Sequence, residues 1–208
     1  MIADSRITVC REQRSYNYLL EQGAPAEKLA VLPDTAFALD PISQEAADGV
    51  LRNEDIPEGS PVVGVNVRPP WDVDADYEEL TDRYLGAVAA MIDWMVSQHA
   101  ARIVLISHCH STDLHTVPAF QDERELRLRV LERVQAKEHV HLLSGEYSPA
   151  ERAGIYGCCE IVVTTRLHVG ILSALGGTPS VNIAYEQTKA RGIAQMMGLE
   201  DYVLDIRD

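Results

Sequence analysis

The sequence predicts an α/β protein with a Rossmann-like parallel sheet and helices on both of its faces. Short apolar segments rich in β-branched residues alternate with longer segments of helical spacing, which is typical of a parallel α/β sheet. The chain of 208 residues is long enough to form one substantial hydrophobic core. Strands are expected at residues 6–9, 29–32, 62–67, 102–106, 140–143, 161–164 and 180–183, with a weaker candidate at 202–206.

Two segments between these strands have the periodicity of amphipathic helices. Apolar residues recur in each at three- and four-residue steps, as one buried helix face requires. They are Leu80, Tyr84, Val88, Met91 and Met95 in the first segment, and Leu126, Val130 and Val134 in the second. On the other face of the second helix, Glu123 lies four residues before Arg127. Glu125 has the same spacing to Arg129, so we interpret these charges as ion pairs on a solvent-exposed surface.

The order of these segments predicts the organisation of the chain. We expect residues 1–55 to form a linking β-α-β segment and residues 56–208 to form a Rossmann-like domain, the two making one compact unit. Residues 53–61 are acidic, contain two prolines and lack apolar periodicity. This composition predicts an exposed connection between the two parts.

The charge balance limits the classes of partner. There are 18 Lys and Arg residues against 32 Asp and Glu residues, which gives a formal net charge of −14. Such an excess of acid argues against binding of nucleic acid or of anionic lipid, because both depend on clustered cations. Residues 1–10 contain no long apolar segment, so we expect neither a signal peptide nor a transmembrane segment. Four cysteines without a C-x-x-C pair fit a reducing, cytoplasmic location.

Two segments resemble metal-binding motifs but lack some of the residues that such motifs require. Residues 108–113 read H-C-H-S-T-D, but no second ligand pair with suitable spacing stands elsewhere. Residues 72–76 read D-V-D-A-D, yet Tyr77 and Arg83 occupy positions where a calcium loop needs Gly and Glu. We therefore expect no metal. The signatures of dinucleotide-binding, P-loop and serine hydrolase sites are also missing from the sequence.

Cationic and proton-transferring residues follow several of the predicted strands. Because the carboxyl ends of parallel strands open on one edge of a sheet, where ligands bind, these residues should gather there. They are Arg68, His108, Thr165, Arg166, His168 and, one helical turn after its strand, Lys189. In a chain with surplus acid, this bias predicts a local anion-binding site.

The strongest local unit spans residues 164–179. Thr165 is expected to cap the following helix, with Arg166 and His168 in the first turn beside unpaired backbone N–H groups. A helix start attracts phosphate or carboxylate, Arg166 adds a bidentate donor, and His168 is placed to exchange a proton. The residues alone equally allow a surface ion pair for Arg166 and a structural role for His168. Arg68, stiffened by two following prolines, is either an anion clamp or structural.

Several motifs together resemble those of the polysaccharide pyruvyl transferase family. They are R-I-T-V-C-R-E-Q-R-S-Y (6–16), L-P-D-T-A-F (32–37), V-G-V-N-V-R-P (63–69), I-S-H (106–108), T-T-R-L-H (164–168), I-L-S-A-L-G-G-T-P (171–179) and N-I-A-Y-E-Q-T-K (182–189). The resemblance implies transfer of pyruvate from phosphoenolpyruvate to glycan hydroxyls, which forms a pyruvate ketal and needs no cofactor. It also implies a GT-B-like fold of two Rossmann-like lobes, of which this chain resembles the C-terminal, donor-binding lobe.

The resemblance also implies roles for particular residues. Arg166 would hold phosphoenolpyruvate, His168 would act as acid or base, and Arg68 would be a second donor-binding arginine. His108 and Lys189 would face the same cleft. The family pattern has Asp after the first arginine, whereas Glu12 follows Arg11 here, which leaves the role of that acid open.

The length of the chain implies further partners. It corresponds to one lobe and a linking segment, so an N-terminal lobe would be missing and the acceptor would be a glycan or a lipid-linked oligosaccharide. Two alternatives remain open at this point. One is the nucleotide-sugar lobe of a GT-B glycosyltransferase, and the other is an inactive sugar- or phosphate-binding homologue.

Overall fold

The main sheet has six parallel strands. The computed structural model describes residues 4–70, 76–109, 123–185 and 187–208. The strands are β3 (Val62–Asn66), β4 (Arg102–Leu105), β5 (Val140–Leu142), β6 (Ile161–Thr164), β7 (Ser180–Ala184) and β8 (Val203–Asp205). Their order is β5-β4-β3-β6-β7-β8, and each neighbouring pair is parallel. This is the doubly wound Rossmann order, so the predicted fold class is confirmed.

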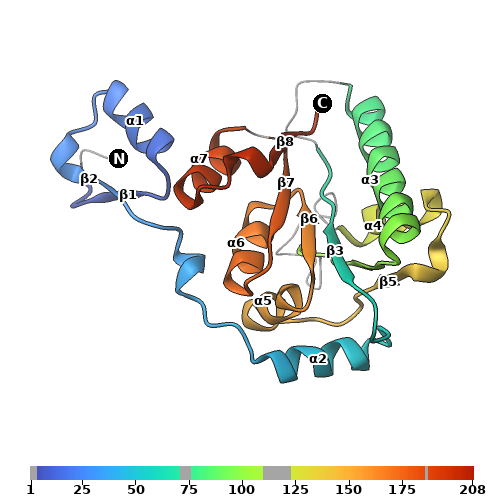
Figure 1. Ribbon diagram of the computed structural model, residues 1–208. Coiled ribbons are helices and arrows are strands. Elements are labelled where there is room, and N and C mark those ends of the chain that lie inside the picture. The colour runs from blue at the N-terminus through green and yellow to red at the C-terminus, as the bar shows by residue number, and fades with distance from the viewer. Residues whose placement is uncertain (1–3, 71–75, 110–122, 186) are drawn as a thin grey trace.

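Helices cover both faces of this sheet because its strand side chains alternate between two cores (Figure 1). Val63 and Val65 belong to the cluster formed with α3 (Tyr77–His99) and α4 (Glu123–Arg133). Val104 and Val162 point to the opposite face, where α5 (Pro149–Gly157) and α6 (Leu167–Leu175) pack. The second core also receives Leu51 of α2 (Gln44–Asn53).

The two predicted amphipathic helices are α3 and α4. Leu80, Tyr84 and Val88 of α3 are buried, as their spacing predicts. Leu126 and Val130 of α4 are buried as well. The solvent-side interpretation of the charges on α4 holds for the exposed Glu125 but is wrong for Glu123 and Arg127. Glu123 is 1% exposed, and Arg127 Nη1 donates to the carbonyl of Leu143 at 2.5 Å.

The α5–α6 pair sets the position of the candidate site, which lies at the start of α6. Ser148 and Glu151 form a reciprocal capping box at the start of α5, which has Pro149 as its first residue. Gly157 and Gly176 let the two helices approach, because a Cβ on Gly157 would lie 3.0 Å from the carbonyl oxygen of Gly176. Gly177 has φ +81° just past α6 and ends that helix.

The N-terminal part forms a separate two-stranded parallel sheet of β1 (Thr8–Cys10) and β2 (Leu29–Val31), joined by α1 (Gln13–Glu21). Figure 1 shows this unit beside α7 (Gln187–Met197), at a distance from the main sheet. Short 3₁₀ segments are η2 (Ala26–Lys28), η3 (Thr35–Ala38), η5 (Lys137–His139) and η6 (Glu200–Tyr202).

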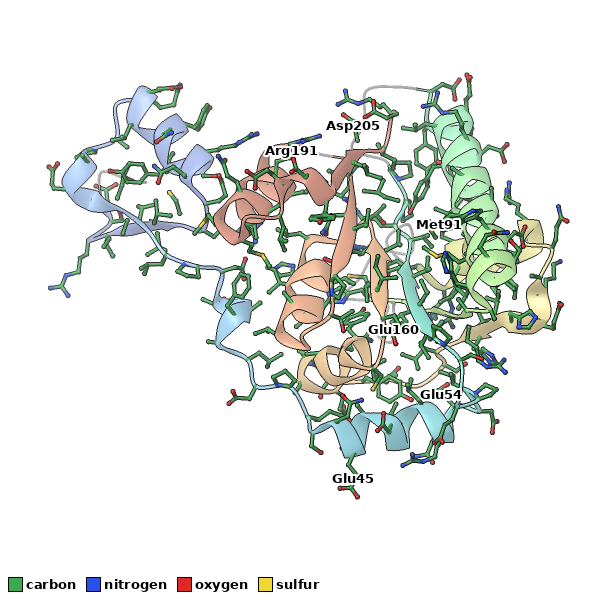
Figure 2. The ribbon with its side chains drawn as sticks, viewed as in Figure 1. Glu45, Glu54, Met91, Glu160, Arg191 and Asp205 are labelled. Atoms are coloured by element: carbon green, nitrogen blue, oxygen red, sulfur yellow. The ribbon has the colours of Figure 1, made fainter. Side chains whose placement is uncertain are left out.

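All eight predicted strands are therefore present, including the weaker candidate near the C-terminus. The connection at 53–61 is mainly exposed, as its composition predicts, although Ile56 is buried in the second core. The polar surface is illustrated by Glu45 of α2, whose side chain points away from the body of the protein (Figure 2). Within the described part of the chain, none of the helices combines the length and the apolar character needed to span a membrane.

Candidate active site

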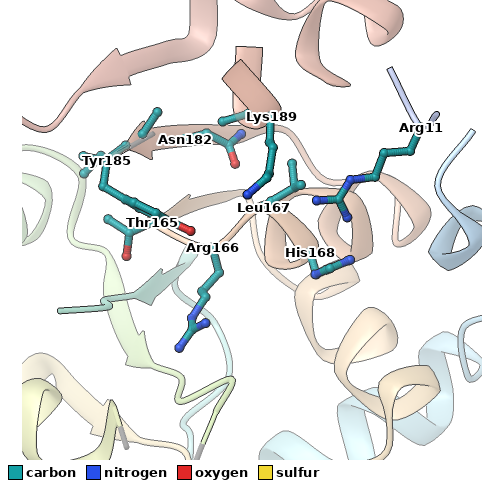
Figure 3. A pocket seen from close by; sticks show the side chains of 11 residues that line it. Arg11, Thr165, Arg166, Leu167, His168, Asn182, Tyr185 and Lys189 are labelled. Atoms are coloured by element: carbon teal, nitrogen blue, oxygen red, sulfur yellow. The ribbon is translucent and has the colours of Figure 1, made fainter. Parts of the chain in front are cut away.

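The candidate site lies at the carboxyl ends of β6 and β7, beside the β3–β6 pair where the order of the doubly wound sheet reverses. Ligands of open α/β sheets bind at this switch point. A pocket of about 160 Å³ opens there. Its polar lining side chains are Arg11, Thr165, Arg166, His168, Asn182 and Lys189 (Figure 3). The structure thus brings together four residues that the sequence selected and adds Arg11 and Asn182.

The start of α6 forms one wall of this pocket. Arg166 is the N-cap residue, and its side chain makes no capping hydrogen bond. The expectation that Thr165 caps α6 is wrong, because the helix begins one residue too late for it. Thr165 turns inward instead, and its Oγ1 accepts a hydrogen bond from the Tyr84 hydroxyl at 3.4 Å. His168 lies in the first turn of α6, as predicted, and its side chain is 48% exposed.

The Arg166 side chain is held by a buried carboxylate. Its Nε donates to Glu123 Oε1 at 2.5 Å. Figure 3 accordingly shows the guanidinium pointing away from the space into which Arg11 and Lys189 extend. Arg166 Nη2 is buried and has no hydrogen-bond partner among the described residues.

Glu123 connects three segments at the edge of the sheet. Besides Arg166, its carboxylate accepts hydrogen bonds from Asn66 Nδ2 at 2.8 Å and from the backbone N–H groups of His108 and Cys109 at 2.7 and 3.4 Å. Asn66 also donates to the carbonyl of Ile106 at 2.9 Å. Glu123 therefore fixes the ends of β3 and β4 relative to the start of α6. Its four-residue spacing to Arg127 predicted a surface ion pair and gave no sign of this role.

Arg68 does not line the pocket. It is 4% exposed, and its Cζ lies 3.6 Å from the ring centroid of Tyr185. Tyr185 does line the pocket, so the arginine stands behind the aromatic ring. A cation over a ring face is attracted by the ring quadrupole, and this stacking fixes both side chains.

Arg11, Asp34 and His168 form a second charged group at the pocket. Arg11 Nη1 donates to Asp34 Oδ2 at 2.8 Å, and the same oxygen lies 3.6 Å from His168 Nε2. Burial alone would raise the pKa of Asp34, but the Ala36 N–H, the Arg11 guanidinium and His168 outweigh it, so the pKa lies below its ordinary value. Arg11 and Asp34 each lie within one of the motifs that resemble the family. Sequence reasoning gave neither residue a role, because 23 residues separate them.

A larger pocket of about 440 Å³ adjoins the first on the other side of His168. It is mainly apolar, and its lining includes Asp34, Leu39, His108 and Leu172. His108 therefore faces this second pocket, whereas Lys189 faces the first. His168 lines both pockets. The imidazole of His168 can therefore reach molecules bound in either pocket.

Glu12 has a structural position outside the pocket lining. It is fully buried, and its side chain caps α1 by accepting from the N–H groups of Arg14 and Ser15 at 2.6 and 2.8 Å. A Cβ on Gly192 would lie 2.6 Å from Glu12 Oε2, so α7 approaches this cap closely. The acid that follows Arg11 therefore caps α1 and packs closely against α7.

No group of three His, Cys, Asp or Glu side chains suited to a metal occurs among residues 4–70, 76–109, 123–185 and 187–208. The segment H-C-H-S-T-D extends past Cys109 into residues that lie outside the described ranges, as does His115. Asp72 to Ala75 of the imitation calcium loop lie outside them as well. Asp76 is described and caps α3 by accepting from the N–H groups of Glu78 and Glu79.

Comparison with solved structures identifies the class of fold. MnaA from S. aureus, solved with UDP, matches with a TM-score of 0.58 and 10% identity over 95% of this chain and 52% of that chain. UDP-GlcNAc 2-epimerase from Neisseria meningitidis, bound to UDP-GlcNAc, matches with a TM-score of 0.57 and 12% identity over 97% of this chain and 56% of that chain. HepE from Anabaena, in complex with UDP and glucose, matches with a TM-score of 0.50 and 15% identity over 93% of this chain and 46% of that chain. The chain thus has the fold of one lobe of a GT-B-like protein.

Sequence comparison defines the family more closely. Residues 2–187 match the family of polysaccharide pyruvyl transferases, and the chain belongs to that family. The amylovoran biosynthesis protein AmsJ from Erwinia amylovora is 24% identical over 200 residues, which are 96% of this chain and 47% of AmsJ. The chain therefore spans about half the length of this curated relative.

Proposed function

We propose that this chain is the donor-binding lobe of an enzyme that transfers pyruvate from phosphoenolpyruvate to two hydroxyls of a glycan in polysaccharide biosynthesis. The observation that carries the proposal is the pocket lined by Arg11, Arg166, His168 and Lys189 in a chain with a net charge of −14. Cations gathered at one point repel one another, and an anionic ligand bound between them relieves this repulsion. Membership of the pyruvyl transferase family supports the same substrate.

Phosphoenolpyruvate fits the size and charge of this pocket. It carries a carboxylate and a phosphate on a three-carbon frame, and the pocket of about 160 Å³ suits a small metabolite better than a larger ligand. We assign Arg11, Arg166 and Lys189, which line the pocket, to the anionic groups, together with the amino end of α6. Arg68 supports the site from behind Tyr185, since its positive charge adds to the local field without contact.

The reaction moves two protons, and we assign both transfers to His168. The first acceptor oxygen bonds to C2 of phosphoenolpyruvate, and C3 gains a proton and becomes a methyl group. The second acceptor oxygen then replaces the phosphate oxygen on C2, and inorganic phosphate leaves with the second proton. His168 accepts each hydroxyl proton in turn and delivers the first to C3 and the second to the leaving phosphate. Its place between the two pockets gives it access to donor and acceptor.

The acceptor and the second lobe complete the proposal. We assign the mainly apolar pocket beside His168 and His108 to the acceptor side, where a glycan or a lipid-linked oligosaccharide would present its hydroxyls. A further lobe, matching the part of AmsJ that this chain does not cover, would close over the acceptor.

Isothermal titration calorimetry of the chain with phosphoenolpyruvate and with UDP tests the donor. We expect phosphoenolpyruvate to bind and Arg11→Ala or Arg166→Ala to weaken it about tenfold or more, because a charge-assisted hydrogen bond contributes about 1.5–3 kcal/mol. Lys137→Ala removes the same charge from an exposed position at the opposite end of the strands and should leave binding unchanged. Binding of UDP alone, binding of neither, or equal binding by all variants overturns the proposal.

Turnover separates the enzyme from an inactive binding homologue. In the two-lobed protein, His168→Ala should reduce kcat far more than it weakens donor binding, because the imidazole acts in the transition state. Donor binding without any release of phosphate in the presence of acceptor would assign the chain to the inactive class.

A further inference from the structure

The carboxylate of Asp34 is fixed before any ligand arrives. Its Oδ1 accepts the Ala36 N–H at 3.0 Å as the cap of η3, and its Oδ2 accepts from Arg11 Nη1 at 2.8 Å. The Asp34 side chain is only 6% exposed. With both oxygens engaged and little room to rotate, Oδ2 is held 3.6 Å from His168 Nε2. This arrangement joins the linking segment before η3 to the helix that carries the proton-transfer residue.

We propose that Asp34 is a positioning residue for His168, which holds Nε2 in its protonated form and leaves Nδ1 to exchange protons with the substrates. This inference rests on the proposed function, because the proton-transfer role of His168 does. Neutral imidazole carries one proton, and the nitrogen that bears it is set by the acceptor it faces. A carboxylate at Nε2 favours the proton there, so Nδ1 has the free lone pair.

The same contact stabilises the charged form of the imidazole. In the reaction, His168 becomes an imidazolium twice, once with the proton of each acceptor hydroxyl. Nδ1 gains each proton from the hydroxyl and returns it, first to C3 and then to the leaving phosphate, while the Nε2 proton stays in place. Asp34 remains ionised throughout and compensates the positive charge at each of these stages.

Several charges face His168, and they act in opposite directions. Arg11, Lys189 and Arg166 line the same pocket and oppose a positive imidazolium, as does His108 of the adjoining pocket when it is protonated. Among the described residues that line the two pockets, Asp34 supplies the negative charge. Removing it should therefore lower the pKa of His168, whereas removing Arg11 and leaving Asp34 should raise it.

Asp34 also has a purely structural alternative, since it caps η3 and pairs with Arg11. The substitution Asp34→Asn separates the two roles. Asparagine caps helices as well as aspartate does, and its side-chain oxygen still accepts a hydrogen bond. The variant therefore retains the cap of η3 through its one oxygen, and it loses the negative charge together with the oxygen that accepts from Arg11. Asp40→Asn is the matched control, because Asp40 is an exposed acid in the same linking segment.

Histidine NMR titration of the chain without ligand tests this inference directly. The His168 ring signals are identified by their loss in His168→Gln. We expect Asp34→Asn to lower the pKa of His168, because the carboxylate 3.6 Å from Nε2 favours the imidazolium. Arg11→Gln should raise it, and Asp40→Asn should leave it unchanged. Thermal unfolding confirms that each variant is folded.

Two results would overturn the inference. An unchanged His168 pKa in folded Asp34→Asn leaves Asp34 with the structural role alone, and a change of equal size in Asp40→Asn shows a general charge effect. Neither result depends on phosphoenolpyruvate binding, so failure here is distinct from failure of the proposed function. In the two-lobed enzyme, Asp34→Asn should reduce kcat at least tenfold with little change in donor KM. It should also move the acidic limb of the kcat/KM profile to lower pH.

Discussion

Replacing Glu123 by glutamine tests whether one buried carboxylate fixes the site. The carboxylate accepts four hydrogen bonds, from Asn66, from two backbone N–H groups and from Arg166. A glutamine oxygen cannot accept all of these, and its NH₂ group would face other donors. The Arg166 guanidinium would lose its buried partner.

The expected cost follows from these contacts. Removing one member of a buried ion pair typically costs about 3–5 kcal/mol, and each buried donor left without a partner costs about 1–3 kcal/mol. We expect Glu123→Gln to lower the free energy of unfolding by about 3–5 kcal/mol, a large part of the 5–15 kcal/mol usual for a domain. At a slope near 2 kcal/mol per M, the midpoint of urea unfolding should fall by about 2 M.

Urea unfolding followed by circular dichroism measures this change. Glu125→Gln is the control, because Glu125 lies in the first turn of the same helix but is exposed, and its cost should stay within about 0.5 kcal/mol. The double variant Glu123→Gln with Arg166→Gln should cost less than the sum of the two single changes, since the contact is then lost only once. A cost for Glu123→Gln no larger than that of the control would refute the role assigned to this carboxylate.

Three other positions give further predictions about stability. A Cβ on Gly170 would lie 2.6 Å from Asn182 Oδ1 in the pocket wall, so Gly170→Ala should lower the free energy of unfolding by about 1–3 kcal/mol. Gly86 occupies an exposed helical position where an added Cβ would have nothing within 4 Å. Gly86→Ala should therefore raise the unfolding temperature. The pKa of Glu54 (Figure 2) is below its ordinary value, because bonds from Tyr147 and two backbone N–H groups outweigh burial, which alone would raise it. Glu54 therefore stabilises the fold at pH values above the ordinary glutamate pKa of about 4.3. In urea unfolding at neutral pH, Glu54→Gln should be less stable than the unchanged protein by about 1–2 kcal/mol, and this difference should disappear as the pH falls well below that pKa. A difference of equal size at both pH values would contradict this prediction.

Sequence periodicity predicted the fold because each strand and helix buries one face or lies between two layers. Runs such as 62–67 and 102–106 are apolar on both faces, and a strand of this kind needs helices above and below it. The same reasoning placed Arg166, His168 and Lys189 at one edge of the sheet, because parallel strands all end there.

The errors concern the environment of individual charges. Spacing of four residues between Glu123 and Arg127 is the same whether the helix face meets solvent or the end of another strand. The burial of Glu123 depends on Asn66 and Arg166, which are 57 and 43 residues away. Thr165 was expected to cap α6, but a shift of the helix start by one residue is beyond what local sequence specifies.

The three arginines at the site share one feature that links the fold to its chemistry. Each guanidinium has a fixed partner: Asp34 for Arg11, Glu123 for Arg166 and the ring of Tyr185 for Arg68. An arginine held in this way loses less side-chain freedom when an anion binds, although each carboxylate also cancels part of the attraction. Because the carboxylates orient the donors, we expect a loss of Glu123 to weaken donor binding even though it removes a negative charge from the neighbourhood of an anion. A purely electrostatic site would show the opposite sign, so the direction of that change in calorimetry decides between orientation and net charge.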